Sequence, residues 1–299
     1  MTRDPRSIPC IGSVLWDIVG RHGHAMRLGD DRPGRIERLP GGVAMNVAMT
    51  LVRFGLAPTV LTCIGTDREG ADLVAECTRR GVDTALALRR NDLPTDRYMA
   101  IEGMGTLVAA IADARSLEAA GVAILAPLHD GRLGSAADPF GGTAVLDGNL
   151  PPALLDAIVA DPAFARADLR VVPASPGKAL RLRPLLAMPN ATLYLNRIEA
   201  DLMAETTFRS SAEAAAALVD AGRARVIVTD GERAATDDGA GTDAAVTAHP
   251  PIVEARRVTG AGDTFMAAHV AAEHAGHNRV FALEAALQAA ATYVSGEEA

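Results

Sequence analysis

Aromatic side chains are scarce in this chain, at 3% of 299 residues, although 49% of the residues are hydrophobic. Alanine supplies much of the apolar content, so we expect helices that pack closely through small residues. The three cysteines, Cys10, Cys63 and Cys77, lack metal-type spacing and favour a reducing environment. No apolar run approaches membrane-spanning length, and the amino-terminal residues lack an apolar signal core. We therefore expect a cytoplasmic protein with no membrane partner.

Basic runs are also absent, and the formal net charge is −8. This balance argues against a nucleic-acid partner and leaves room only for a local basic pocket. There is no Gly-x-x-x-x-Gly-Lys-Ser/Thr loop and no Gly-x-Ser-x-Gly elbow. Gly260-Ala261-Gly262 lacks the third glycine of a dinucleotide fingerprint, which disfavours a Rossmann dehydrogenase. His269, His274 and His277 miss the paired-histidine spacing of zinc sites and are expected on the solvent side of helices.

What the chain does contain is the stretch Val258-Thr259-Gly260-Ala261-Gly262-Asp263-Thr264-Phe265, followed by helix-forming residues. Glycines allow backbone N–H groups to point the same way, and the first amides of a helix lack internal acceptors. Such a turn binds phosphate or charge developing on a phosphoryl group. Asp263 would lie beside that anion, placed to take a proton from an attacking hydroxyl. The alternative is structural, since Asp in a first helical turn is also a common cap or dipole partner.

Short apolar strands alternate with helices along the chain, which predicts an α/β fold with a mainly parallel sheet covered by helices on both faces. The expected strands are Ile8–Val14, Thr59–Ile64, Val122–Ala126, Ala144–Leu146, Leu169–Val172, Thr192–Leu195 and Arg225–Thr229. The expected helices are Val43–Phe54, Glu69–Arg80, Pro152–Ala160, Lys178–Ala187, Ile198–Ala204, Ala212–Gly222, Asp263–Ala275 and Arg279–Val294.

Polar residues follow the first strand and open the first helix. Asp17 comes just past the end of Ile8–Val14, and ligands of open α/β sheets gather at the carboxyl ends of strands. Gly41 and Gly42 would let a ligand approach the backbone closely. Asn46, one turn into the helix, can donate and accept hydrogen bonds, as a vicinal diol requires. Turn or cap roles are the alternatives for Asp17 and Asn46.

Polar groups also follow three later strands, in Asp147-Gly148-Asn149, in Asn196-Arg197-Ile198-Glu199 and in Thr229-Asp230-Gly231. In a parallel sheet these ends share one edge with Asp17 and the Gly260–Asp263 turn. Asn196 and Glu199 project from one side of a helix start and could hold a hydrated Mg²⁺. The same pair also matches a capping box, which is the structural alternative.

A small second sheet is expected from residues 18–40 and 95–113. Arg97–Glu102 and Thr106–Asp113 read as a hairpin around Gly103-Met104-Gly105. A mobile sheet over a site that excludes water would serve as a lid. Its apolar surface and free edges predict a homodimer formed through the lid.

Taken together, these residues resemble the ribokinase or PfkB family of sugar and nucleoside kinases. The motifs that carry the resemblance are Gly41-Gly42…Asn46, Gly65-x-Asp67-x-x-Gly70, Asn196-x-x-Glu199, Thr229-x-Gly231 and Gly260-Ala261-Gly262-Asp263. The resemblance implies one ribokinase-like α/β domain over residues 1–299, with the lid inserted in it, and phosphorylation of a sugar hydroxymethyl group by ATP. It implies that Asp263 is the base and that Gly260, Ala261 and Gly262 form the anion hole. It places substrate at Asp17, Gly41, Gly42, Asn46 and Asn149, nucleotide at Asn196, Thr229, Gly231, Thr259 and Gly262, and Mg²⁺ at Glu199 and, through water, Asn196.

Within that family several segments are similar to the pseudouridine kinases, among them Asp147-Gly148-Asn149-Leu150 and Asn196-Arg197-Ile198-Glu199-Ala200. The resemblance therefore implies transfer of the ATP γ-phosphoryl group to the 5′-hydroxyl of pseudouridine. A free sugar or another nucleoside as acceptor, or a nucleoside-binding protein without turnover, are the alternatives. The chain departs from the family pattern at Leu15, Met45, Ala112, Ala234 and Arg257. Arg257 replaces an acidic or amide residue near a monovalent-cation site. Activation by K⁺ is therefore disfavoured and is kept only as an alternative.

Overall fold

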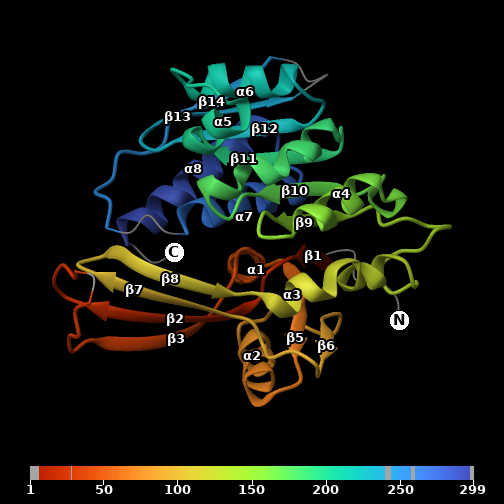
Figure 1. Cartoon of the computed structure of the whole chain (residues 1–299). Helices are drawn as coiled ribbons and strands as arrows, with labels where there is room; N and C mark the ends of the chain where they lie inside the picture. The colour runs from red at the N-terminus through yellow and green to blue at the C-terminus, as the bar shows by residue number, and fades with distance from the viewer. Residues whose placement is uncertain (1–6, 28, 240–243, 257–259, 297–299) are drawn as a thin grey trace.

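The computed structural model describes residues 7–27, 29–239, 244–256 and 260–296. Within this part of the chain, strands form sheets of eight, four and two strands. Figure 1 shows the eight-stranded sheet with its helices as one body, and the four-stranded sheet projecting beside it. The carboxyl-terminal helix reaches the same side of the molecule as the projecting sheet. The expected α/β class and mainly parallel central sheet are confirmed.

The large sheet has the strand order β14-β13-β12-β11-β10-β9-β1-β4. All neighbouring pairs from β12 to β4 are parallel, and β13 and β14 complete one edge in antiparallel fashion. Parallel neighbours end at the same edge, so the loops that follow β1, β9, β10, β11 and β12 lie together. The strands are β1 (Ser7–Ile11), β4 (Ala57–Leu61), β9 (Thr143–Asp147), β10 (Asp168–Val172), β11 (Ala191–Asn196), β12 (Arg225–Asp230), β13 (Arg233–Gly239) and β14 (Val246–Ala248).

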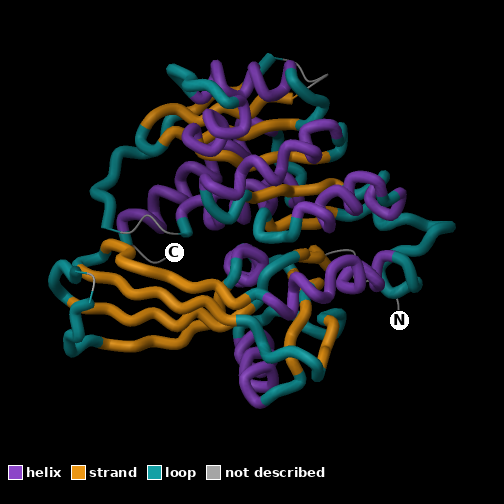
Figure 2. Tube along the Cα trace, in the orientation of Figure 1, coloured by secondary structure: helices purple, strands orange, loops and turns teal. Residues whose placement is uncertain are grey.

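Helices cover both faces of this sheet (Figure 2). Alternate strand residues face opposite ways, so Val226 and Val228 enter one core while Ile227 enters the other. The first core contains residues of α3 (Arg115–Ala120), α4 (Pro152–Ala160), α5 (Arg197–Ala204), α6 (Ser211–Asp220) and the 3₁₀ segments η1 (Gly121–Leu128), η2 (Pro162–Phe164) and η3 (Pro176–Ala187). The second contains residues of α1 (Val43–Arg53), α2 (Arg68–Arg79), α7 (Ala261–His274) and α8 (Arg279–Ser295). The small β5 (Cys63–Gly65) and β6 (Leu88–Arg90) pair beside them.

The four-stranded sheet has the order β3-β2-β7-β8 and is the projecting sheet of Figure 1. It consists of β2 (Leu15–His22), β3 (Arg35–Gly41), β7 (Arg97–Gly103) and β8 (Thr106–Asp113), so the expected hairpin is present. We expected residues 18–40 to begin this sheet and Asp17 to follow a core strand. Instead Asp17 lies inside β2, because the chain turns after Ile11 and Leu15-Trp16 already pair with β3.

Other expectations were wrong in detail. Val122–Ala126 is a 3₁₀ segment and not a strand, since Ile124, Leu125 and Leu128 bury one helical side and Pro127 cannot donate to a ladder. Lys178–Ala187 is helical as expected, in 3₁₀ form. The antiparallel edge strands β13 and β14 were not anticipated. No helix in the described ranges is both long and apolar enough to span a membrane.

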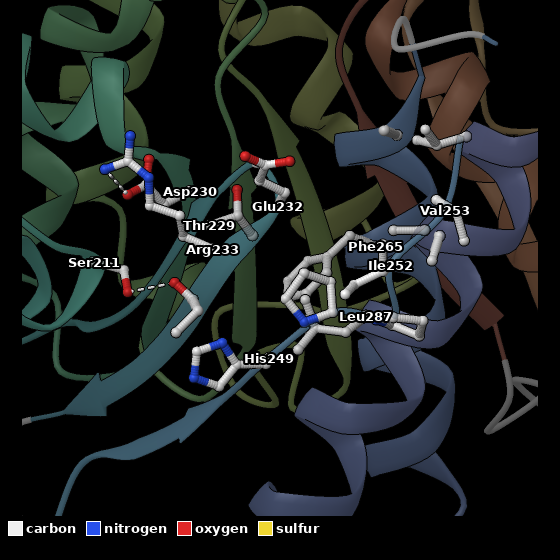
Figure 3. Close-up of a pocket in the computed structure, with 18 of the residues that line it drawn as sticks. Ser211, Thr229, Asp230, Glu232, Arg233, His249, Ile252, Val253, Phe265 and Leu287 are labelled. Carbon is white, nitrogen blue, oxygen red and sulfur yellow. Dashed lines mark hydrogen bonds and ion pairs between the residues drawn. The ribbon is translucent and has the colours of Figure 1, made fainter. Parts of the chain in front are cut away.

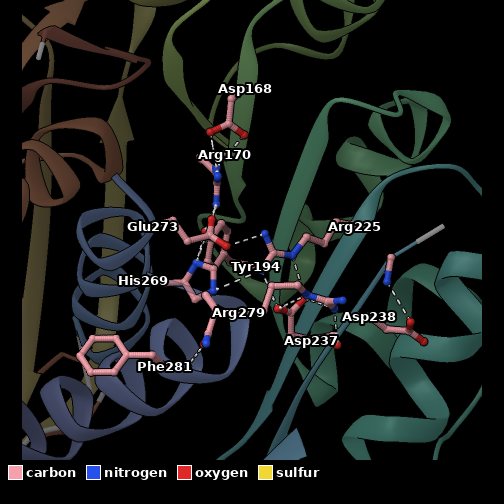
Figure 4. A network of polar contacts seen from close by, with 12 residues as sticks. Asp168, Arg170, Tyr194, Arg225, Asp237, Asp238, His269, Glu273, Arg279 and Phe281 are labelled. Carbon is pink, nitrogen blue, oxygen red and sulfur yellow. Dashed lines mark hydrogen bonds and ion pairs between the residues drawn. The ribbon is translucent and has the colours of Figure 1, made fainter. Parts of the chain in front are cut away.

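A buried polar network links the second core to the sheet and overturns the expectation for His269. His269 is fully buried on α7, and its Nδ1 lies 3.0 Å from Tyr194 Oη (Figure 4). Burial lowers the pKa of His269 to about 4, so the ring is neutral at pH 7. Arg225 Nη1 donates to Glu273 Oε1 at 2.8 Å and Arg225 Nε to Asp237 Oδ1 at 2.7 Å. The network ties α7 to β10, β11, β12 and β13.

Candidate active site

The amino terminus of α7 presents unsatisfied backbone donors at the carboxyl edge of the sheet. Gly260 precedes the helix with φ 90°, a left-handed conformation that suits glycine. No side chain in the described part of the chain caps the helix, and Thr264 N–H makes the first backbone bond, to Gly260 O at 3.0 Å. The amides of Ala261, Gly262 and Asp263 therefore remain available, and Gly262 is exposed.

Asp263 and Asn46 come together from opposite ends of the chain. The Asn46 side-chain amide lies close enough to the Asp263 carboxyl to lower its pKa, and α1 packs against α7. Burial raises the pKa of Asp263, the negative charges of Asp147 and Glu199 raise it as well, and the Asn46 amide lowers it; the resulting pKa is about 7. A carboxyl that titrates near neutral pH is suited to exchanging a proton with a substrate hydroxyl.

Gly41 and Gly42 leave space where β3 passes into α1. A β-carbon at Gly41 would collide with the Asp17 carboxylate, and one at Gly42 would collide with the Ser13 carbonyl. Asp17 thus lies directly against the Gly41-Gly42 turn that opens the helix of Asn46. Burial raises the pKa of Asp17 to about 6. The structure therefore brings Asp17, Gly41, Gly42 and Asn46 into one region with Asp263.

Asn149 joins this region through Ser13 and Asp147. Asp147 is fully buried, and its Oδ2 accepts hydrogen bonds from Ser13 N–H at 2.8 Å and from the Ser13 hydroxyl. Ser13 Oγ accepts from Asn149 Nδ2 at 3.3 Å and from Val43 N–H at 3.0 Å. Burial raises the pKa of Asp147. The loops after β1 and β9 are thereby fastened to the start of α1.

Asn196 and Glu199 form a capping box at the start of α5. Glu199 N–H donates to Asn196 Oδ1 at 2.9 Å, and Asn196 N–H donates to Glu199 Oε2 at 2.8 Å. The capping box, which the sequence offered as the alternative to a Mg²⁺ site for this pair, is therefore present. Glu199 is 6% exposed and forms no ion pair within the described residues, and burial raises its pKa to about 7.

A cavity of about 930 Å³ opens beside the start of α7, large enough for a nucleotide. Thr229 and Gly231 line it from the end of β12, and Ala261 and Gly262 line it from α7. Figure 3 shows polar side chains such as Ser211 and Asp230 on one side and Phe265, Ile252 and Leu287 on the other. The cavity thus joins an apolar wall to the uncapped amides of α7.

Some residues of the site were missed or cannot be placed. Thr259 and Arg257 lie outside the described residues. Ser13, Asp147 and Lys178 were not assigned roles, although Lys178 Nζ hydrogen-bonds Asn149 Oδ1. Lys178 carries one signal that could have found it, because it is the only lysine beside 28 arginines.

Comparison with known proteins identifies the family of this chain. The pfkB family carbohydrate kinase profile matches residues 5–299. The chain belongs to the pfkB family. Members of this family are phosphotransferases that act on hydroxyl groups of sugars or nucleosides, so the expectation of a kinase is confirmed.

Individual proteins are similar to this chain at low sequence identity. Pseudouridine kinase of Escherichia coli K12 is 29% identical over 112 residues, which are 37% of this chain and 36% of that protein's length. A carbohydrate kinase from Agrobacterium tumefaciens has a TM-score of 0.80 at 24% identity, with 98% of this chain and 94% of that chain covered. A protein assigned as ribokinase II from E. coli, solved with ATP and Mg²⁺, has a TM-score of 0.74 at 20% identity, with 97% and 92% covered. These structures share the fold.

Proposed function

We propose that this pfkB kinase transfers the γ-phosphoryl group of ATP to the 5′-hydroxyl of a ribosyl substrate, and that the substrate is pseudouridine. The contact between Asn46 and Asp263 carries the proposal, because it joins the acceptor region to a base beside the uncapped amides of α7. The similarity to an E. coli pseudouridine kinase supports the choice of acceptor.

In this mechanism Asp17, Gly41, Gly42, Asn46 and Asn149 hold the ribosyl group. Asp263 accepts the proton of the attacking hydroxyl, which makes the oxygen a better nucleophile. The amides of Gly260, Ala261 and Gly262 stabilise charge on the phosphoryl group as it is transferred. Phosphoryl transfer requires mainly positioning and charge stabilisation, and these groups supply both.

The nucleotide would occupy the cavity of about 930 Å³, which joins an apolar wall to Thr229, Gly231 and the start of α7. Asp147, Asp263 and Glu199 are carboxyls with raised pKa values that form no ion pair in the described ranges. An uncompensated acidic edge fits a cation, and Glu199, with Asn196 through water, would hold Mg²⁺. When bound, Mg²⁺ neutralises phosphate charge and ATP supplies the phosphoryl group.

The small sheet would close over this site as a lid, because Asp17 lies within it. Its other face carries apolar side chains. Ile111 pairs with Met99, and Met99 pairs with Ile18; Ile111 is 70% exposed and Met99 48% exposed. Burying this face against the same face of a second copy would remove apolar area from water. The kinase would then be a cytoplasmic homodimer joined through its lids.

An acceptor screen tests the proposed function. ADP release is measured with ATP and Mg²⁺ in the presence of pseudouridine, adenosine, ribose or fructose, with the Asp263→Asn variant as the matched control. We expect pseudouridine to give the highest kcat/KM. A higher kcat/KM with ribose or fructose would replace the nucleoside by a free sugar, and ligand-induced stabilisation without ADP release would contradict turnover.

A further inference from the structure

Lys178 is the one lysine in a chain that has 28 arginines. It stands in η3, directly after β10, at the edge of the sheet where the candidate site lies. The preceding residues are packed against the neighbouring turn, since Gly148 N–H donates to Val172 O at 2.8 Å. Two adjacent strand ends therefore set the position of Lys178.

The contact of Lys178 fixes the Asn149 amide. An ammonium group only donates hydrogen bonds, so the Asn149 oxygen must face Lys178 Nζ and its NH₂ group must face Ser13. Both ends of the Asn149 side chain are thus engaged by the protein. This leaves Asn149 with less capacity to bind a substrate than the sequence suggested.

The Lys178 ammonium group can donate further hydrogen bonds. Lys178 is half-buried, and within the described residues it forms one hydrogen bond and no ion pair with a carboxylate. Two of its three N–H groups are therefore available to an oxygen atom beside Asn149. An arginine would present a longer, planar set of five donors in place of this compact rotating group.

We propose that Lys178 binds an oxygen atom of the acceptor substrate, a carbonyl or a hydroxyl, and thereby selects acceptors that present one beside Asn149. This inference rests on the proposed function for its substrate class. An ammonium cannot accept a hydrogen bond, so Lys178 favours a base bearing carbonyl oxygens over one bearing an amino group at that position.

The single lysine permits a direct binding test on the unmodified protein. The rate of acetylation of Lys178 by an amine-selective reagent is followed by peptide mass spectrometry, alone, with MgATP, and with pseudouridine or ribose. We expect pseudouridine to slow acetylation at least about fivefold and MgATP alone to leave it unchanged. Unchanged acetylation with both acceptors, or equal protection by MgATP alone, would overturn the proposal.

Variants then separate direct contact from the positioning of Asn149. Lys178→Met is expected to raise the acceptor KM about 10- to 100-fold, the range for a lost charged hydrogen bond, with the KM for ATP unchanged. Arg181→Met removes a cation from the same segment and is the control. The increase should persist in an Asn149→Ala background. Its disappearance there would show that Lys178 acts only through Asn149 and would refute direct binding.

Comparing pseudouridine with ribose identifies the substrate oxygen atom that Lys178 binds. Protection of Lys178 and turnover are measured separately, so that this inference and the proposed function can fail independently. An increase in KM for both pseudouridine and ribose supports a sugar hydroxyl, and an increase for pseudouridine alone supports a base carbonyl. Turnover without protection of Lys178 counts against this site alone. Protection without turnover counts against the kinase reaction and supports the site, and the absence of both refutes both.

Discussion

The side chain of Asn46, near the beginning of the chain, lies beside the carboxyl of Asp263, near its end. Two helices that start at the same edge of the sheet meet through this pair, one beginning after Gly42 and the other after Gly260. The group proposed to hold the acceptor and the group proposed to deprotonate it therefore lie side by side. Movement of α1 or α7 would therefore change the distance between the bound sugar and the Asp263 carboxylate.

Replacing Asp263 by Asn tests the base. We expect kcat to fall by about 10²- to 10⁴-fold, the contribution typical of proton transfer, because the amide cannot accept the hydroxyl proton in its place. The KM values should change little, since the size of the side chain is kept. Steady-state ADP release measures both constants, with exposed Asp156→Asn as the control. Near-normal turnover of Asp263→Asn would exclude this role.

The pH dependence of kcat/KM should follow the same carboxyl. Asp263 has a pKa of about 7 in the folded protein and must be ionised to accept a proton. Activity should therefore rise with pH up to about 7 and then level off. The residual activity of Asp263→Asn should lack this rise. The same acid limb in the variant would assign it to Asp17 or Glu199, whose pKa values are also raised.

Ionisation of Asp263 should lower the stability of the folded protein, whereas it should raise the activity. The unfolded carboxyl ionises near pH 4 and the folded one near pH 7, so the unfolded state loses its proton first. The free energy of unfolding therefore decreases as pH rises between these values. Asp263→Asn should have a higher melting temperature than the parent at pH 8 and a smaller difference at pH 4. Calorimetry at the two pH values checks the sign.

Asp17 should affect the acceptor and not the nucleotide. Removing its carboxylate in Asp17→Ala is expected to raise the acceptor KM at least about tenfold, because hydrogen bonds to charged groups contribute about 1.5–3 kcal/mol. The KM for ATP should stay within about twofold. An equal rise in both KM values would instead indicate a general change in the small sheet.

The exposed face of the small sheet should control assembly. Ile111→Asp places a charge on the apolar face proposed as the interface and is expected to give a monomer by light scattering. Val122→Asp is the control, because Val122 is 61% exposed in η1, outside the small sheet. A parent protein that is already a monomer would contradict the dimer.

The buried network should support folding without taking part in the reaction. Asp237 is fully buried, and burial alone would raise its pKa; hydrogen bonds from Arg225 and Arg279 hold it below the usual value. Arg225→Met removes one of these partners and should lower the free energy of unfolding by about 3 kcal/mol. Urea unfolding measures this loss. Turnover per folded molecule should be unchanged at low temperature.

Much of this organisation is visible in the sequence because strand cores are apolar and helix ends carry proline or glycine. Arg225–Thr229 and Pro152–Ala160 were placed within one residue at each end by such signals. The Asn196 and Glu199 pattern predicted two arrangements, and the capping box is present. Asp17 was misplaced because the break after Ile11 depends on pairing with β3 and β7, which no local pattern reveals. Lys178 and Asn149 meet only because β9 and β10 are neighbours in the sheet.

Alternation within β2 has a consequence for how this protein can change. Asp17 and Ile18 are successive residues and point to opposite sides of the small sheet. Insertion of one residue ahead of them would turn the carboxylate outward and the isoleucine to the inner side of the sheet. Length changes in this strand must therefore come in pairs, whereas single substitutions can alter one side and leave the other intact.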